Sequence, residues 1–187
     1  MIFDDIAAKL NRRTALPLLN PVELFDTNLS RTIRNANLPG LVTCGLLVWN
    51  DDIAAAHPIA QEMDNIHGNY WHAMIHRREG DYWNAKYWFR LVGNHPVQVE
   101  LTRMAEARSF LKKGVFMPGL MVDACERANE RANERASEHA NAHAHELAQT
   151  GTNAGPAPVD DEIEALQRLQ LAEIKALLNY CRLLPAN

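Results

Sequence analysis

Apolar positions along this chain recur with helical spacing. The first half has no long alternating segment rich in Val, Ile and Thr, and no Asn-Gly or Asp-Gly hairpin turn. The C-terminal segment has the strongest helical pattern, with Asp160 as its cap. Its apolar face consists of Ile163, Leu166, Ile174, Leu177, Cys181 and Leu184. The sequence therefore predicts an all-α protein, a helical bundle or orthogonal array of about six to seven helices.

Glycines, prolines and capping residues divide the rest of the chain. Residues 17–40 are rich in Asn, Pro and Thr, and we expect them to wrap around the body with one helical turn near 21–25. Asn65 to Asn69 is predicted to be a turn, and Pro58 is expected to kink its helix because proline removes a backbone donor. The other predicted helices cover residues 4–13, 52–64, 70–79, 82–92 and 97–113, and about thirty residues after Pro118.

The domain organisation predicted is one helical domain over residues 1–187. Residues 126–149 contain a tetrapeptide repeat with Ala at every fourth position, which drifts around a helix of 3.6 residues per turn and forms no continuous core stripe. We interpret this Ala-rich, low-complexity helix and a flexible linker at 150–158 as an insertion. Residues 159–184 are then predicted to pack back on the core, near Val122 and Cys125.

Composition and charge narrow the class of partner. Hydrophobic residues make up 47% of the chain and charged residues 22%, as in ordinary globular proteins. The net charge of −4 provides no basic field for nucleic acid, and the longest apolar run is about half the length that spans a bilayer. The three cysteines form no CxxC pair, which is typical of a reducing compartment. We expect a cytoplasmic protein that contacts neither nucleic acid nor membrane.

Residues 69–96 carry the most specific pattern. A Gly80-Asp81-Tyr82 turn lies between two predicted helices, with small residues at Ala73 and Ala85, an aromatic at Phe89 and a closing Pro96. This pattern resembles a tetratricopeptide repeat, and residues 41–64 resemble a degenerate preceding unit. Residues 71–79 also look like the Trp-His-x-x-x-His-Arg-Arg-Glu core of uncharacterised bacterial proteins, which indicates no activity. The resemblance implies a helix–turn–helix core at 41–96.

The repeat resemblance also implies a ligand-binding face on the first helix of the unit. In that family the corresponding positions bind peptides, and adjacent arginines suit carboxylate or phosphate groups. The alternative is that these arginines simply form surface ion pairs. The residues expected to line this basic-aromatic groove are His67, Tyr70, Met74, Arg77 and Arg78.

A second reading concerns metal binding. His72, His76 and Glu79 are spaced i, i+4 and i+7, which places them on one helical stripe, and His57 is a candidate fourth ligand from the preceding helix. Two imidazoles and a carboxylate suit zinc or iron with an open position. The alternative is that the two histidines lie in a helix contact and hydrogen-bond to Tyr87 or Lys86.

The leading function is an intracellular binding or scaffold protein that uses the groove for a protein, an anionic peptide or an anionic small molecule, without a cofactor. The alternative is a metal-dependent enzyme of unspecified reaction that uses the His/His/Glu stripe. A third possibility is self-association, for instance as a homo-dimer, through the last helix or the Ala-rich helix. No phosphate loop, dinucleotide fingerprint or nucleophile elbow is present in the sequence.

Overall fold

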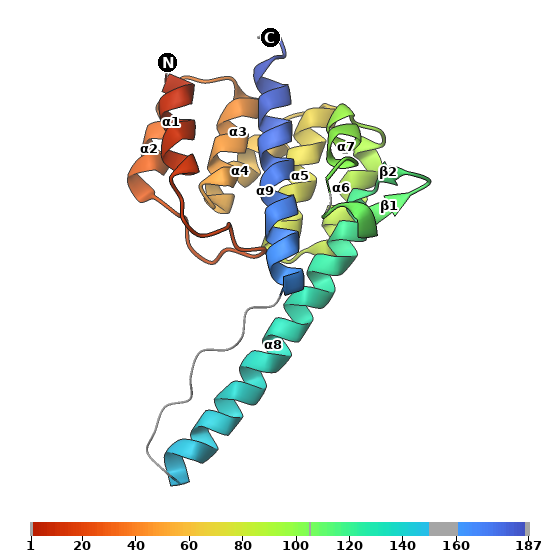
Figure 1. Cartoon of the computed structure of the whole chain (residues 1–187). Coiled ribbons are helices and arrows are strands. Elements are labelled where there is room, and N and C mark those ends of the chain that lie inside the picture. Colours follow the sequence, from red (N-terminus) through yellow and green to blue (C-terminus); the bar gives the residue numbers. More distant parts are fainter. Residues whose placement is uncertain (1, 105, 150–160, 186–187) are drawn as a thin grey trace.

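The computed structural model describes residues 2–104, 106–149 and 161–185, with side chains to residue 138 in its longest helix (Figure 1). Apart from the nine α-helices of these ranges, there are one turn of 3-10 helix and one two-stranded hairpin, so the all-α prediction is confirmed. The elements are α1 (Ile2–Asn11), α2 (Thr27–Arg34), α3 (Gly40–Trp49), α4 (Ile53–Gln61), α5 (Ile66–Glu79), α6 (Tyr82–Val92), α7 (Pro96–Leu101), η1 (Arg108–Phe110), β1 (Leu111–Lys112), β2 (Val115–Phe116), α8 (Pro118–Gln149) and α9 (Asp161–Arg182).

Consecutive helices pair as hairpins, and the C-terminal helix joins them. Helices α3 and α4 pack together, α4 packs on α5, and α5 packs most extensively on α6. Helix α9 packs mainly against α3, and also against α7 and α8. In Figure 1 it crosses the front of the body beside α3 and α5, so the last helix covers the centre of the bundle.

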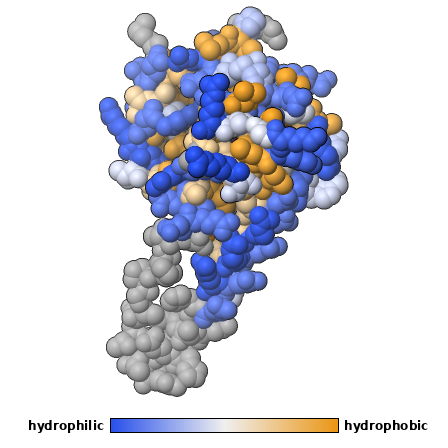
Figure 2. All heavy atoms as spheres, turned by 45° about the vertical axis from the view of Figure 1, so that its right-hand side comes forward, coloured by the Kyte–Doolittle hydropathy of each residue, from blue (hydrophilic) through white to orange (hydrophobic). Residues whose placement is uncertain are grey.

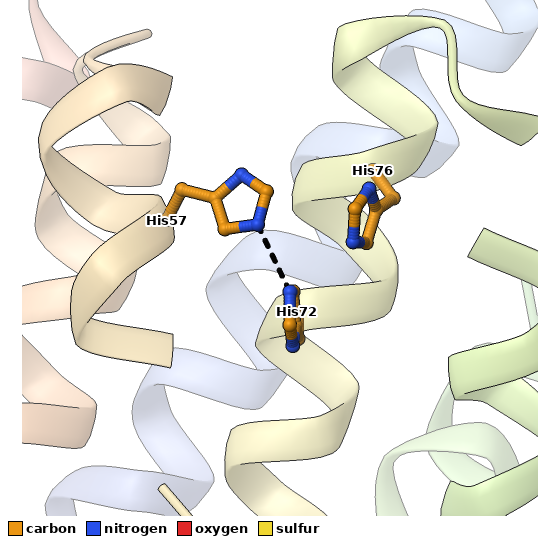
Figure 3. Close-up of side chains that lie close together, drawn as sticks. All are labelled: His57, His72 and His76. Carbon is orange, nitrogen blue, oxygen red and sulfur yellow. Dashed lines mark hydrogen bonds between the residues drawn. The ribbon is translucent and has the colours of Figure 1, made fainter. Parts of the chain in front are cut away.

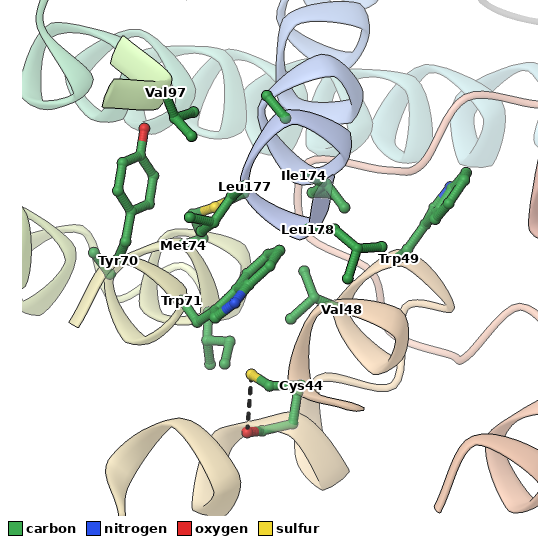
Figure 4. Close-up of a cluster of buried hydrophobic side chains, with 14 of the residues drawn as sticks. Cys44, Val48, Trp49, Tyr70, Trp71, Met74, Val97, Ile174, Leu177 and Leu178 are labelled. Atoms are coloured by element: carbon green, nitrogen blue, oxygen red, sulfur yellow. Dashed lines mark hydrogen bonds between the residues drawn. The ribbon is translucent and has the colours of Figure 1, made fainter. Parts of the chain in front are cut away.

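The core lies where α3, α5 and α9 meet (Figure 4). Trp71 from α5 is fully buried beside Leu178 of α9 and the backbone of α3. A Cβ atom on Gly45 would lie 2.5 Å from Cζ2 of Trp71, so glycine is required there for the indole to approach α3. A close contact between ring and backbone therefore fixes the separation of α3 and α5.

Capping residues explain most of the helix boundaries. Asp52, Asn65 and Asp81 each accept a hydrogen bond from a backbone N–H in the first turn of α4, α5 and α6. Gly80 ends α5 in the left-handed conformation, with φ of 81°. The predicted helix at 82–92 is confirmed. The predicted turn at residues 65–69 is wrong, because the Asn65 side chain accepts from two N–H groups and starts α5 at Ile66.

Two other segments differ from prediction. Residues 27–34 form α2, capped by Asp26, where a wrapping segment is predicted. The helix predicted over 97–113 is six residues long and begins at Pro96, since proline at the first helical position costs no hydrogen bond. The chain then forms η1 and an antiparallel hairpin that turns at Lys113 and Gly114, both with positive φ.

The long helix predicted after Pro118 is confirmed as α8. Its first turns are buried against the body through Met121, Val122, Ala124, Cys125 and Ala128. From residue 132 to 138 its side chains are exposed, and Figure 1 shows the helix extending away from the bundle. The predicted linker at 150–158 and the Asp160 cap lie outside the described residues.

Polar side chains cover most of the face shown in Figure 2, with hydrophobic ones in small separate groups. Trp83 is the most exposed aromatic residue of the described chain, at 71%. Among the described helices, none has both the length and the apolar character needed to cross a membrane.

Two arginines of α5 are buried in ion pairs. Nη2 of Arg77 donates to Glu173 of α9 at 2.6 Å, and the Tyr70 hydroxyl donates to the same carboxylate at 2.9 Å. Arg78 pairs with Asp51 and donates to the Val48 carbonyl. Because each charge has a counter-charge and further hydrogen bonds, the interior accommodates them.

Replacing Arg77 with alanine should destabilise the protein strongly, because Glu173 then remains as a buried carboxylate without its cation. We expect a loss of about 3–5 kcal/mol in the free energy of unfolding, measured by urea titration. The matched control is Arg168→Ala, which removes an exposed pair with Glu164 and should cost less than about 1 kcal/mol. Similar losses in both variants would contradict this account.

Candidate metal centre

Three histidines from two adjacent helices face one another. His57 projects from α4, and His72 and His76 project from successive turns of α5 into the space between the helices (Figure 3). One ring nitrogen of each residue lies within 4.8 Å of the others. The two closest, Nε2 of His57 and Nε2 of His72, are 2.9 Å apart. The structure thus brings together three of the four residues predicted as metal ligands.

The two histidines of α5 converge because residues four apart lie on one face of a helix. Their rings stack with centroids 4.7 Å apart. On its other side His72 contacts the ring of Trp88 from α6, with centroids 4.1 Å apart. His72 is therefore fixed between neighbours, while the His57 side chain at the surface is 25% exposed.

The spacing of the nitrogens is close to that of a metal site. Two imidazole nitrogens bound tetrahedrally to zinc at about 2.0–2.1 Å lie about 3.3 Å apart. The His57–His72 separation is slightly shorter than this and the widest separation in the cluster is larger. The nitrogen–nitrogen separations therefore lie on both sides of the distance expected for two ligands of one zinc ion.

The electrostatics favour neutral rings. Burial, followed by the neighbouring charges of His76 and His57, lowers the pKa of His72 to about 4. Burial and then His57 also lower the pKa of His76, against the opposing effect of Glu79 and Asp81. Since a metal binds the neutral imidazole, the rings of His72 and His76 already have the uncharged state that a ligand needs at neutral pH.

Glu79, the fourth predicted ligand, lies on the outer side of this cluster. Its Oε1 is 2.7 Å from Nδ1 of His57, and its Oε2 is 3.5 Å from Nδ1 of His76. Asp81 is also 3.5 Å from Nδ1 of His76, which is buried and makes no hydrogen bond. The carboxylates therefore face the Nδ1 atoms of the two rings.

The alternative to metal binding is that His72 and His76 hydrogen-bond to Tyr87 or Lys86. Lys86 instead pairs with Asp123 and Glu126 of α8, at 2.9 and 3.1 Å. Tyr87 contacts the rings of Trp83 and Trp88. The sequence pattern did not identify the contact of Trp88 with His72, because no helical repeat relates residues on different helices.

Four of the five predicted groove residues are buried, so they do not line an open groove at the surface. Tyr70 and Met74 are fully buried, and Arg77 and Arg78 are each 1% exposed within the ion pairs described above. The physical reason is that α5 is central and is covered by α3, α4 and α6. A helix covered on several sides has no free concave face.

His67 is the one predicted groove residue that remains partly exposed. It borders a cavity of about 550 Å³ together with Met63, Cys181 and Arg182. Its Nδ1 is 2.9 Å from Nε2 of the buried His95, a residue that no spacing pattern in the sequence links to His67. His95 caps α7, where its Nδ1 accepts from the Val97 N–H, so Nε2 carries the proton and donates to His67.

Comparison with known proteins adds no assignment: no protein-family model, curated protein or solved structure matches the chain. The predicted helix–turn–helix of residues 70–92 is present as α5 and α6, the pair of described helices with the most extensive contact. The resemblance to tetratricopeptide repeats itself stays a prediction.

The buried His95 should make stability depend on pH. Burial, and to a lesser extent His67, lowers the pKa of His95 from 6.5 to about 4. Below pH 6.5 the unfolded chain binds a proton that the folded protein excludes, so the free energy of unfolding falls as the pH falls towards 4. This one group should contribute a loss on the order of 1–2 kcal/mol between about pH 7 and about pH 5.

The measurement is urea unfolding of wild type and His95→Asn over this range. Asparagine retains a helix-capping oxygen but does not titrate, so its profile should be shallower. Above about pH 7 the two profiles should run parallel, because neutral histidine predominates in both states. Parallel profiles over the whole range would show that His95 does not cause the dependence.

Proposed function

We propose that this protein binds one divalent transition metal ion, zinc or iron, through His57, His72 and His76, and that it uses the ion in a hydrolytic reaction. The observation that carries the proposal is the convergence of three imidazoles from α4 and α5, with ring nitrogens within 4.8 Å. Three protein ligands are typical of catalytic zinc sites, which keep a fourth position for water or substrate. Structural zinc sites usually have four protein ligands, often thiolates.

Local charge supports a divalent cation. The neutral rings of His72 and His76 contribute no positive charge of their own. Glu79 lies within 3.5 Å of Nδ1 of both His57 and His76, and Asp81 lies 3.5 Å from Nδ1 of His76. Since metal-bound histidines usually donate their other N–H to a carboxylate, the hydrogen bond between His57 and Glu79 also matches the usual surroundings of a ligand.

Access to the site supports a reactive rather than a purely structural ion. The side chains of His57 and Glu79 are 25% and 32% exposed. Glu79 also belongs to the wall of a surface cavity of about 610 Å³ between α4 and the segment around Pro21 to Leu24. A metal ion bound to water with an open position lowers the pKa of that water to about 7, which supplies hydroxide at neutral pH.

The binding or scaffold function has less support, because burial removes Tyr70, Met74, Arg77 and Arg78 from any groove. Of the predicted groove residues, only His67 is partly exposed and borders a cavity. The metal proposal instead rests on residues that are together and partly accessible.

The binding step is tested with tag-free, dialysed protein titrated with zinc or cobalt. All variants carry His139→Ala, His143→Ala and His145→Ala, so that these histidines of α8 cannot bind metal. We expect one equivalent to bind, and His57→Ala or His76→Ala to weaken binding by more than the roughly 10–100-fold that loss of an outer partner costs. His67→Ala is the matched control and should bind normally. A protein of this background that retains well below one equivalent would exclude the proposal.

The hydrolytic step is tested with an activated ester, p-nitrophenyl acetate. The zinc-loaded protein should hydrolyse it faster than the chelator-treated protein, with a rate that rises through about pH 7 as bound water ionises. His72→Ala should remove the zinc-dependent part of the rate. If metal binds but the rate does not change, the ion has no hydrolytic role towards this ester, and the reaction class proposed here would be wrong.

A further inference from the structure

We infer that Glu79 is a positioning residue, which fixes the tautomer of His57 and joins α4 to α5 around the metal. This inference rests on the proposed metal site and gives Glu79 a different role from the ligand predicted from the sequence. The decisive observation is the 2.7 Å contact between Oε1 of Glu79 and Nδ1 of His57.

The contact determines where the His57 proton lies. An ionised carboxylate only accepts hydrogen bonds, so Nδ1 of His57 must carry the hydrogen. In the neutral ring, Nε2 of His57 is then left with its lone pair, and this is the atom that points to His72 (Figure 3). Glu79 thus presents the metal-binding nitrogen of His57 to the centre of the cluster.

In the metal-free cluster, the direction of the hydrogen bond between His57 and His72 is also determined. Because Nε2 of His57 accepts, Nε2 of His72 must donate across the 2.9 Å contact. Binding of an ion then requires the proton on Nε2 of His72 to move to the other ring nitrogen or to solvent. Without a metal ion, the hydrogen bond between the two rings therefore links α4 to α5 at this point.

Glu79 has no competing partner among the described residues. It lies one turn beyond His76 on α5, and its two oxygens face the Nδ1 atoms of His57 and His76. Asp81, the other nearby carboxylate, is already engaged as the cap of α6 and accepts from both the backbone and the side chain of Asn84. Glu79 is therefore the carboxylate free to orient the imidazoles.

A ligand role for Glu79 makes a different prediction. Glutamine at this position retains a carbonyl oxygen that accepts from Nδ1 of His57, but it is a poor metal ligand. A positioning role therefore predicts partial rescue by Glu79→Gln, and unchanged ligands around the ion. A ligand role predicts no rescue and a changed ligand set.

The experiment measures cobalt affinity and the visible spectrum of the saturated complex, in the background without His139, His143 and His145. We expect Glu79→Ala to bind roughly 10–100-fold more weakly than wild type, and Glu79→Gln to recover much of the loss. The spectra at saturation should be the same in all three proteins. The control is Glu62→Ala, which removes an exposed carboxylate at the end of α4 and should not change affinity. Circular dichroism of the metal-free proteins checks that each variant is folded.

Other results separate the two proposals. If wild type binds no cobalt, the metal site itself is wrong. If wild type binds, His57→Ala does not, and Glu79→Ala equals wild type, only the positioning role is wrong. Weak binding by both Glu79 variants with an altered spectrum would also overturn positioning, in favour of direct ligation.

Discussion

The buried contact of Arg77 with Glu173 fixes how the last helix of the chain meets the centre of the bundle. It joins the central helix α5 to the last helix α9, and Tyr70 supplies the carboxylate with a second donor. A charge pair in an apolar interior has little tolerance for displacement, because any gap leaves a desolvated ion. The position of α9 over α3 and α5 is thereby fixed by a directional interaction as well as by hydrophobic packing.

The geometry of the histidine cluster depends indirectly on how α5 is positioned in the core. Trp71, which follows Tyr70 on α5, packs against Gly45 of α3 and sets the depth of α5 in the bundle. The next residue, His72, then faces α4, and α4 is itself paired with α3. The distance from His57 to His72 is therefore a consequence of core packing, and an error in the core would separate the candidate ligands.

Local signals predicted much of the secondary structure. Asp81 and Gly80 mark their helix boundary because capping and left-handed backbone are properties of single residues. Asn65 predicts a turn but caps a helix, because asparagine side chains do both. The helix predicted over 97–113 failed because the hairpin there is only two residues per strand, too short for an alternating pattern.

The candidate site was predictable only in part, for a related reason. Spacing along one helix predicted that His72 and His76 would share a face. It also named Arg77 and Arg78 as surface groups, because a sequence does not show that Asp51 and Glu173 arrive from distant elements to neutralise them. That Glu79 faces the outer nitrogen of His57 depends on the helix-to-helix geometry, which no spacing rule contains.

The long sequence separation of the central ion pair has a consequence for synthesis. Tyr70 and Arg77 leave the ribosome about a hundred residues before Glu173, the carboxylate that both require in the interior. Until then, burial of α5 would leave a guanidinium in the core without its counter-ion. Burial of α5 before α9 is synthesised therefore adds little stability to the nascent chain. The core is completed only when α9 is available to pack on it.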